Sequence, residues 1–298
     1  MANIEHLTKL KQGASSWLDW LDLAHQPAID LVGANLTNTN LSQVYLVKAN
    51  LNNADLSNSL LCQANLTGAN LETAELVDAN LHMANLTGAN LQSAYLNDAD
   101  LTEANLIGSD LRFVQGRSAN FHASNLVGTS LRLAQLRSAN FTEAKLNRAN
   151  LSETDLAKTS FDLADLSGAN FFEAELQSAS FYRANLYRVR AIKTHFSHGY
   201  LLACNLLEAD LTSCDLRWAN LSYANLQSAN LQQVQLRGAN LNRANLTGAN
   251  LEGGNLRGAN LTKANLCQAN LKDADLEDTL FDKAKLTGTI MPDGTVHY

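Results

Sequence analysis

One apolar residue in every five dominates the sequence from Leu31 to Met291. Of the 53 positions reached in steps of five, 43 are Leu and seven are Phe, and from Ala34 onward the residue two positions earlier is always small. An α-helix turns by about 140° over such a step, so it could not keep this repeat on one face. In an extended segment, residues two apart point to the same side. The repeat therefore predicts very short strands, each followed by a corner, in which the small residue and the apolar residue (the central residue) point inward.

Seven glycines indicate how many strands make one lap of the chain. They are separated by multiples of 20 residues, at Gly68, Gly88, Gly108, Gly128, Gly168, Gly248 and Gly288. Glycine suits a corner because it adopts a positive φ at little cost. If four repeats make a lap of 20 residues, these glycines stack along one edge. We expect about 13 laps, which at about 4.8 Å for each lap would form a rod of roughly 60 Å.

The repeats, such as Ala84-Asn85-Leu86-Thr87-Gly88, resemble the pentapeptide-repeat family, whose motif is A(D/N)LXX. The resemblance covers residues 31–291. It implies an all-β solenoid, a right-handed quadrilateral parallel β-helix, which we expect at residues 29–291. The stretch Leu10-Lys11-Gln12-Gly13, followed by Trp17 and Trp20, resembles the helical leader of cyanobacterial members of that family.

Both ends of the chain depart from the repeat. In residues 1–28, apolar residues follow steps of three and four, which predicts helices that Gly13 divides and Pro27 ends, with Ser16 and Asp19 as a capping pair. Trp17, Leu18 and Leu21 are expected to cover the first lap, because an open end of stacked strands invites aggregation; the alternative is a docking helix for a partner. Residues 292–298 begin with Pro-Asp-Gly-Thr, a turn signal, and are expected to cap the last lap. With both ends covered, a monomer is favoured.

Composition favours a protein without chemistry of its own. No run of 18 apolar residues exists and no secretory signal precedes the repeats, so we expect a cytoplasmic protein without a membrane span. Cys204 and Cys214 should be buried and Cys62 and Cys267 should face outward, without a zinc-binding pattern. Inward positions are apolar or small, and catalytic motifs are missing. We therefore expect no enzyme activity, no cofactor and no metal.

Inside the repeats, the unusual composition of residues 172–200 predicts a site for a protein partner. No acidic residue occurs between Glu175 and Glu208, while basic and aromatic residues of the types enriched in interfaces gather there. The alternative is a local packing irregularity with a solvated basic surface. The candidate partner-binding residues, called the belt below, are Phe172, Tyr182, Arg183, Tyr187, Arg188, Arg190, Ile192, Lys193, His195, His198 and Tyr200.

Arg217, Arg237 and Arg257 form a second candidate site. Their spacing of 20 residues should stack them about 5 Å apart, with Trp218 pointing outward beside the first. Three like charges so close need anions, or a carboxylate such as Asp215, to offset their repulsion. This candidate anion ladder could bind an anion or an acidic partner.

Two classes of function remain after an enzyme is set aside. The first is a rigid non-catalytic scaffold that binds an unknown protein partner. The second comes from the resemblance, because some members of the family mimic DNA and protect gyrase. A duplex of 60 Å carries roughly 35 negative charges, whereas this chain has a net charge of −7. We therefore favour the scaffold, keep the DNA mimic as the alternative, and expect no binding of nucleic acid.

Overall fold

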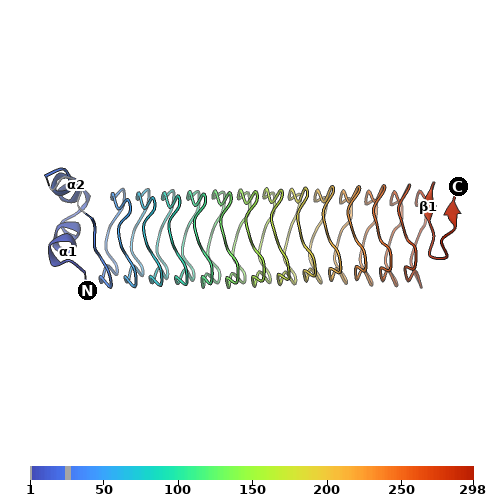
Figure 1. Ribbon diagram of the computed structural model, residues 1–298, viewed down its shortest axis with the longest axis horizontal. Helices are drawn as coiled ribbons and strands as arrows, with labels where there is room; N and C mark the ends of the chain where they lie inside the picture. Colours follow the sequence, from blue (N-terminus) through green and yellow to red (C-terminus); the bar gives the residue numbers. More distant parts are fainter. Residues whose placement is uncertain (1, 24–27) are drawn as a thin grey trace. The chain divides into compact units, whose positions relative to one another are not determined.

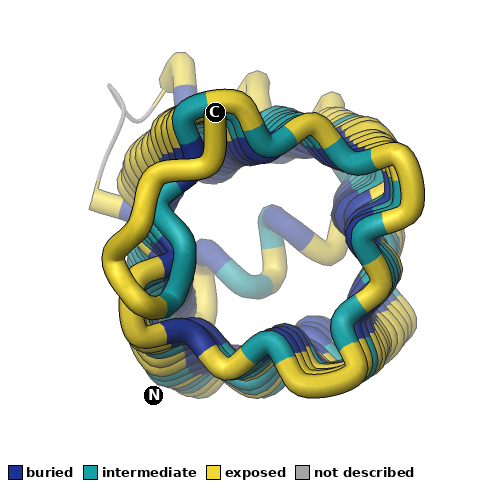
Figure 2. The backbone as a smooth tube through the Cα atoms, turned by 90° about the vertical axis from the view of Figure 1, so that its right-hand side faces the viewer, coloured by how far each residue is buried: buried dark blue, intermediate teal, exposed yellow. Residues whose placement is uncertain are grey.

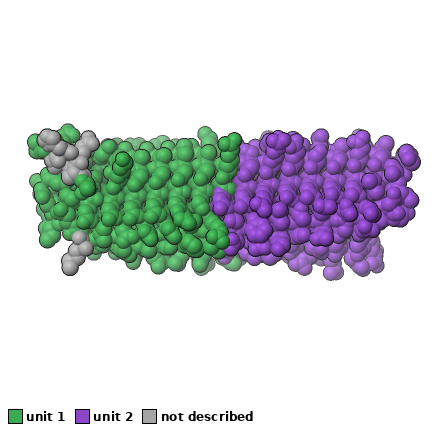
Figure 3. Space-filling model, viewed as in Figure 1, with its two compact units in different colours: residues 1–149 green, residues 150–298 purple. Residues whose placement is uncertain are grey.

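The computed structural model describes residues 2–23 and 28–298 of the chain. It divides into unit 1, residues 1–149, and unit 2, residues 150–298 (Figure 3). Unit 1 contains the helices α1 and α2 and the first run of repeats. Unit 2 contains the second run of repeats and the short strands β1 and β2 (Figure 1).

In each unit the chain winds in laps whose strands pair in parallel. The residue before each central residue forms a bridge with the residue 20 positions later, from Asp30 with Asn50 to Asn125 with Lys145 in unit 1, and from Asn150 with Asn170 to Asn270 with Ile290 in unit 2. A turn follows every fifth residue, so one lap of 20 residues contains four turns. This is the lap length that the glycine spacing predicted.

The interior of each unit is filled by the inward residues of the repeats. Central residues from Leu31 to Leu271 and most of the small residues before them are buried, and they line the inner side of the tube in Figure 2. Phe side chains from successive laps stack, as in Phe161 and Phe181, whose ring centroids lie 4.9 Å apart. In the described residues every buried side-chain nitrogen or oxygen has a hydrogen-bond partner. The interior is therefore packed mainly with apolar side chains, and buried hydroxyls bond to the backbone, as Thr194 Oγ1 does to Phe171 O at 2.7 Å.

The four cysteines lie as the repeat predicted. Cys204 and Cys214 are buried, while Cys62 and Cys267 are half-buried, and all four are free. Burial raises the pKa of the Cys204 and Cys214 thiols. These two residues therefore behave as small apolar residues of the core.

Two helices precede the laps of unit 1. α1 spans Ile4–Lys11 and α2 spans Ala14–Leu23, and Gly13 between them has a φ of +103°, so glycine divides the helices as predicted. The predicted capping pair is wrong, because Trp17 N–H already donates to Gly13 O at 3.0 Å and α2 therefore starts before Ser16. Pro27 lies outside the described residues. Neither helix has the length and apolarity to cross a bilayer.

The helices and the preceding residue Asn3 contact the first lap through hydrogen bonds. Asn3 N–H donates to Asp30 O at 3.1 Å, Asp30 N–H donates to His6 Nδ1 at 3.0 Å, and Trp17 Nε1–H donates to Tyr45 O at 2.8 Å. Trp17 and Leu21 are buried, whereas Leu18 is exposed. Backbone groups that a preceding lap would pair in the interior of the stack are thus paired here by the helices.

The C-terminal segment returns along the last lap as a hairpin. β1, Thr289–Ile290, pairs antiparallel with β2, Val296–His297. The turn between the strands is held by Asp293 Oδ1, which accepts from Thr295 N–H at 2.9 Å. Elsewhere in this lap the central residues Leu276, Phe281 and Leu286 are only half-buried.

Candidate partner-binding surface

The belt residues encircle unit 2. Each lap has four walls, and bridge residues 20 positions apart lie on the same wall. We name the four walls by one bridge residue of each: Arg190, His195, Tyr200 and Asn205. Arg190 and His195 belong to two of these walls. Two turns lie between the Arg190 wall and the His195 wall. One contains Phe172, and the other contains Ile192 and Lys193. Tyr187 and Arg188 form the turn between the Asn205 and Arg190 walls. Only four belt residues, Tyr182, Arg183, His198 and Tyr200, lie on the Tyr200 wall or its bordering turns.

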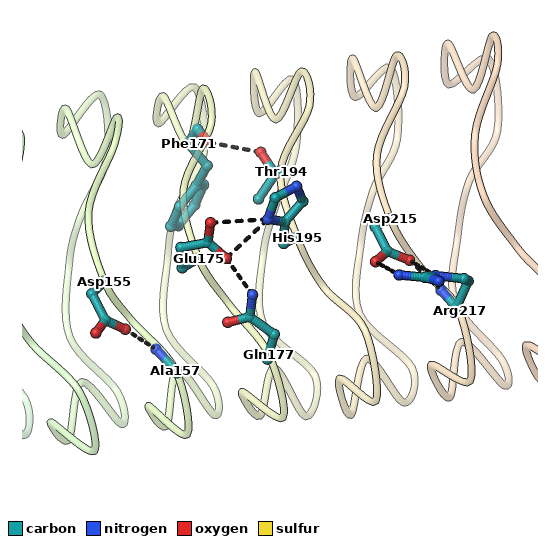
Figure 4. A network of polar contacts seen from close by, with 9 residues as sticks. All are labelled: Asp155, Ala157, Phe171, Glu175, Gln177, Thr194, His195, Asp215 and Arg217. Carbon is teal, nitrogen blue, oxygen red and sulfur yellow. Dashed lines mark hydrogen bonds and ion pairs between the residues drawn. The ribbon is translucent and has the colours of Figure 1, made fainter.

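Carboxylates from adjacent laps neutralise much of the belt's positive charge. Arg188 Nε lies 2.6 Å from Glu208 Oε2, and Lys193 Nζ lies 3.3 Å from Glu173 Oε1. His195 Nδ1 lies 2.9 Å from Glu175 Oε2, and Figure 4 shows this third pair. Each pair joins residues 20 positions apart. The segment between Glu175 and Glu208 has no acidic residue in its sequence, but its surface does have carboxylates. Stacking of the laps brings them from both sides.

Two aromatic residues of the belt are covered by arginines. The guanidinium carbon of Arg188 lies 5.0 Å from the ring centroid of Tyr187, and that of Arg190 lies 5.7 Å from the centroid of Phe172. Both rings are half-buried. These cation–π contacts use up ring surface that a partner would otherwise meet.

Two of the three arginines in the candidate anion ladder already have carboxylate partners. Arg217 holds Asp215 by a two-point contact, Nε to Oδ1 at 2.8 Å and Nη2 to Oδ2 at 2.7 Å (Figure 4). This contact keeps the pKa of the Asp215 carboxyl below its ordinary value. Arg257 pairs with Asp275 and Glu277. Arg237 between them has no ion pair with any described residue.

Exposed large hydrophobic side chains are distributed differently in the two units. In the laps of unit 1 they are scattered over different walls and turns, at Tyr45, Leu60, Met83, Tyr95, Ile107 and Phe113. In the laps of unit 2, those of the described residues all lie on the Tyr200 wall or on the turns that border it. We call this set the aromatic face: Leu163, Tyr182, Tyr200, Trp218, Tyr223 and Leu280.

Contacts on the aromatic face hold its rings in place. Tyr182 and Tyr200 are stacked, with centroids 6.4 Å apart and planes at 25°. The Trp218 ring lies across the next lap, since a Cβ added to Gly238 would be 2.2 Å from its Cζ3. Tyr223 accepts a hydrogen bond from Arg243 Nη1 at 2.9 Å, and the guanidinium carbon of Arg243 lies 5.3 Å from the Tyr223 ring centroid, yet 53% of Tyr223 remains exposed. The rings are therefore both exposed and positioned, as the anchors of an interface are.

Sequence reasoning found half of this face. Tyr182 and Tyr200 were in the belt and Trp218 was noted beside the ladder, but Leu163, Tyr223 and Leu280 were missed. These three are far apart in the sequence and occupy two different positions of the repeat. Sorting all outward hydrophobic residues by their position in the 20-residue lap would have grouped them.

The chemistry available here is recognition. The surface offers aromatic rings, guanidiniums and amides, and the described residues contain no cluster of side chains that could hold a metal ion. Such a surface can bind a partner by stacking, charge and hydrogen bonding.

Comparisons with known proteins found one family model and several solved structures. A family model described as pentapeptide repeats matches a series of stretches that together run over residues 29–292. HetL, a pentapeptide repeat protein involved in heterocyst differentiation regulation from the cyanobacterium Nostoc sp. strain PCC 7120, is 36% identical over 70% of this chain and 91% of its own, with a TM-score of 0.35. No curated protein sequence matches the chain.

Two further solved structures are similar. Rfr23, a pentapeptide repeat protein from the cyanobacterium Cyanothece 51142, is 31% identical over 42% of this chain and 64% of its own, with a TM-score of 0.16. QnrB1, a plasmid-mediated fluoroquinolone resistance protein, is 18% identical over 67% of this chain and 84% of its own, with a TM-score of 0.37.

Proposed function

Because the chain belongs to the pentapeptide-repeat family, we propose that it is a non-catalytic scaffold that binds a protein partner through the aromatic face of unit 2. The observation that carries this proposal is the gathering of exposed large hydrophobic residues on one wall of unit 2 and the turns that border it, while those of unit 1 are scattered. Exposed apolar surface gathered in one place is typical of interaction sites, whereas single exposed residues are normal.

The remaining belt residues have a different role in this proposal. Arg188, Lys193 and His195 have carboxylate partners, and Tyr187 and Phe172 are covered by arginines. They would contribute to stacking of adjacent laps more than to binding. Tyr182, Arg183, His198 and Tyr200 would contact the partner.

The finer features of the fold belong to the same proposal. We infer a right-handed quadrilateral β-helix of about 13 laps, with the N-terminal helices and the C-terminal segment as caps. The hydrogen bonds from α1 and α2 to the first lap support the first cap, and the β1–β2 hairpin supports the second. The protein would act as a monomer in the cytoplasm.

A pull-down from a lysate of the source organism tests the binding surface. We expect a variant with Tyr200, Trp218 and Tyr223 all changed to Ser to lose the partner that the parent protein recovers. The matched control changes Tyr95, Met83 and Phe113 to Ser, which are one bridge residue and two turn residues at equivalent places in the repeats of unit 1. Equal recovery by both variants would contradict the proposal.

The DNA-mimic alternative requires a separate assay. QnrB1, to which this chain is similar, is a fluoroquinolone resistance protein, but a mimic of a duplex needs a dense negative surface. The net charge of −7 and the exposed arginines of unit 2 speak against that surface. We expect no inhibition of gyrase supercoiling at micromolar protein, and inhibition would favour the mimic over the scaffold.

A further inference from the structure

We infer that the partner presents an acidic, extended protein segment to the aromatic face, and this inference rests on the proposed scaffold function. The charge of the Tyr200 wall and of the turns that border it supports this inference. From residue 177 to residue 263, this wall and its turns carry no Asp or Glu. Basic residues occur instead on both bordering turns, in a protein whose net charge is −7. Charge of one sign gathered on one wall selects a partner of the opposite sign.

Several of these cations have no counterion in the protein. Arg217 and Arg257 are paired with carboxylates, whereas four others have no ion pair with any described residue: Arg183, Arg237, Arg243 and Lys263. Arg237 lies on one border of the wall, and Arg243 on the other. A bound segment with carboxylates would meet positive charge on both of its sides. The wall and its bordering turns therefore form a track that carries aromatic rings and cations side by side.

The length of the track suits a short extended segment. From Tyr182 to Lys263 the face runs over about four laps, which at about 4.8 Å for each lap is roughly 19 Å. An extended peptide covers that distance with about six residues. Apolar side chains of the segment would contact Trp218 and Tyr223, while its carboxylates would face the bordering cations.

Ring geometry favours a peptide over single-stranded nucleic acid. Bases bind proteins by stacking on open aromatic rings. Here Tyr182 and Tyr200 are stacked on each other, and one side of the Trp218 ring lies against Gly238. Ring edges and partly covered rings suit apolar side chains better than a run of bases. A nucleic acid is therefore kept as an outcome of the test.

Fluorescence anisotropy with three labelled probes tests the inference. The probes are a 12-residue peptide of repeated Glu-Glu-Phe, the matching neutral peptide of repeated Gln-Gln-Phe, and a 12-nucleotide oligothymidylate. We expect the Glu peptide to bind at least tenfold more tightly than the Gln peptide at low salt, and to weaken as salt increases because the contacts are ionic. Trp218→Ser should weaken the Glu peptide about tenfold.

A pair of charge variants locates the binding surface. Changing Arg183, Arg237 and Arg243 together to Ser should weaken the Glu peptide at least tenfold. The control changes Arg188, Arg190 and Lys193 to Ser, which removes the same charge from belt residues on other walls, and it should leave binding within twofold of the parent. Circular dichroism of each variant establishes that it is folded.

Several outcomes would overturn the inference. They are equal binding of the two peptides, equal loss in the control variant, tighter binding of the oligonucleotide, and no binding of the Glu peptide. A concentration-dependent dimer that Trp218→Ser abolishes would identify a second copy of the chain as the occupant, which also overturns it. If the Glu peptide fails while the aromatic-face variant still loses its partner in the pull-down, only the acidic character is wrong. If both fail, the proposed function is wrong as well.

Discussion

The second turn residue of every repeat has a positive φ, whether or not it is glycine. Gly88 has a φ of +64°, Ser93 in the next repeat has a φ of +58°, and even Phe113 has a φ of +60°. A residue other than glycine pays roughly 1–2 kcal/mol for this left-handed conformation. Such strain is tolerated because each turn is held by the hydrogen bonds of the laps on either side, as for Ser93 N–H, which donates to Arg112 O at 2.9 Å. Glycine is therefore favoured at these turns but not required.

Substitutions at two neighbouring turns should change stability in opposite directions. Nothing lies within 4 Å of a Cβ added to Gly88, so Gly88→Ala adds backbone strain without a clash. We expect Gly88→Ala to lower the free energy of unfolding by about 1 kcal/mol, and Ser93→Gly to leave it unchanged or raise it by a few tenths. Urea unfolding followed by circular dichroism measures both, and Ser93→Ala is the control without a change in strain. An unchanged midpoint for Gly88→Ala would show that these turns are not strained.

Stability should also depend on pH through the Asp110–Arg112 pair in unit 1. The guanidinium of Arg112 contacts both carboxylate oxygens, Nε to Oδ1 at 2.9 Å and Nη2 to Oδ2 at 2.6 Å. This hydrogen bonding, against a smaller opposing effect of burial, holds the pKa of Asp110 below its ordinary value. A group whose pKa is lower in the folded state adds stability above its unfolded pKa, about 3.9 for Asp, and loses it as the pH falls through the folded pKa.

Arg112→Gln therefore has a pH-dependent effect. At pH 6 we expect it to lower slightly the urea concentration at which half of the protein is unfolded, because exposed ion pairs stabilise a protein only a little. The difference from the parent should shrink below pH 4 and vanish below the folded pKa of Asp110. Arg117→Gln is the matched control, because Arg117 has no ion pair with any described residue. Urea unfolding at four pH values measures both variants, and a constant difference for Arg112→Gln would contradict the linkage.

At the scale of elements, the N-terminal segment supplies hydrogen-bond partners to backbone groups of the first lap. Inside the stack, a bridge residue forms two hydrogen bonds with the preceding lap, one through its N–H and one through its carbonyl. Asn85 N–H, for example, donates to Ala64 O at 2.9 Å. For Asp30 and Tyr45 the partners are instead Asn3, His6 and Trp17. The side chains of His6 and Trp17 and the backbone N–H of Asn3 thus satisfy backbone groups that would otherwise remain at an open strand edge.

Removing one of these contacts should loosen the first lap. Trp17→Phe keeps the buried ring but leaves Tyr45 O without its indole donor, at a cost of about 1–3 kcal/mol. We expect faster amide hydrogen exchange in residues 29–48, measured by mass spectrometry, with little change in unit 2. Ile4→Ala is the control, since Ile4 on α1 is 81% exposed. Unchanged exchange in Trp17→Phe would mean that the helices do not stabilise this lap.

At the scale of the whole molecule, acidic composition and a basic wall coexist. The chain has a net charge of −7, yet the Tyr200 wall of unit 2 carries cations without counterions among the described residues. A solenoid permits this because each wall is a separate row of outward residues. The charges of these residues do not affect the packing of the apolar interior. Net charge therefore describes solubility and long-range repulsion, and recognition depends on a single wall.

The repeat pattern was enough to predict the local structure. Small and central residues point inward because an extended segment places residues two apart on one side. The lap of 20 residues followed from glycines at one turn, and the bridges from Asn65 to Asn85 and from Asn185 to Asn205 have this spacing. The division of the helices at Gly13 and the turn after Pro292 were also predicted. The capping pair at Ser16 failed because α2 already begins at Ala14, and its first backbone hydrogen bond runs from Trp17 N–H to Gly13 O.

The sequence by itself determined the period, the inward residues, the lap length and the turns, because all of these follow from contacts between residues close in the chain or at one constant spacing. Only the tertiary structure decided which outward residues share a wall and which charges are already paired. Glu208 reaches Arg188, and Trp218 crosses Gly238, from neighbouring laps. The belt is continuous in sequence but divided among four walls in space, whereas the aromatic face is scattered in sequence and gathered in space. The physical reason is that winding places residues 20 apart side by side and turns residues five apart onto different walls.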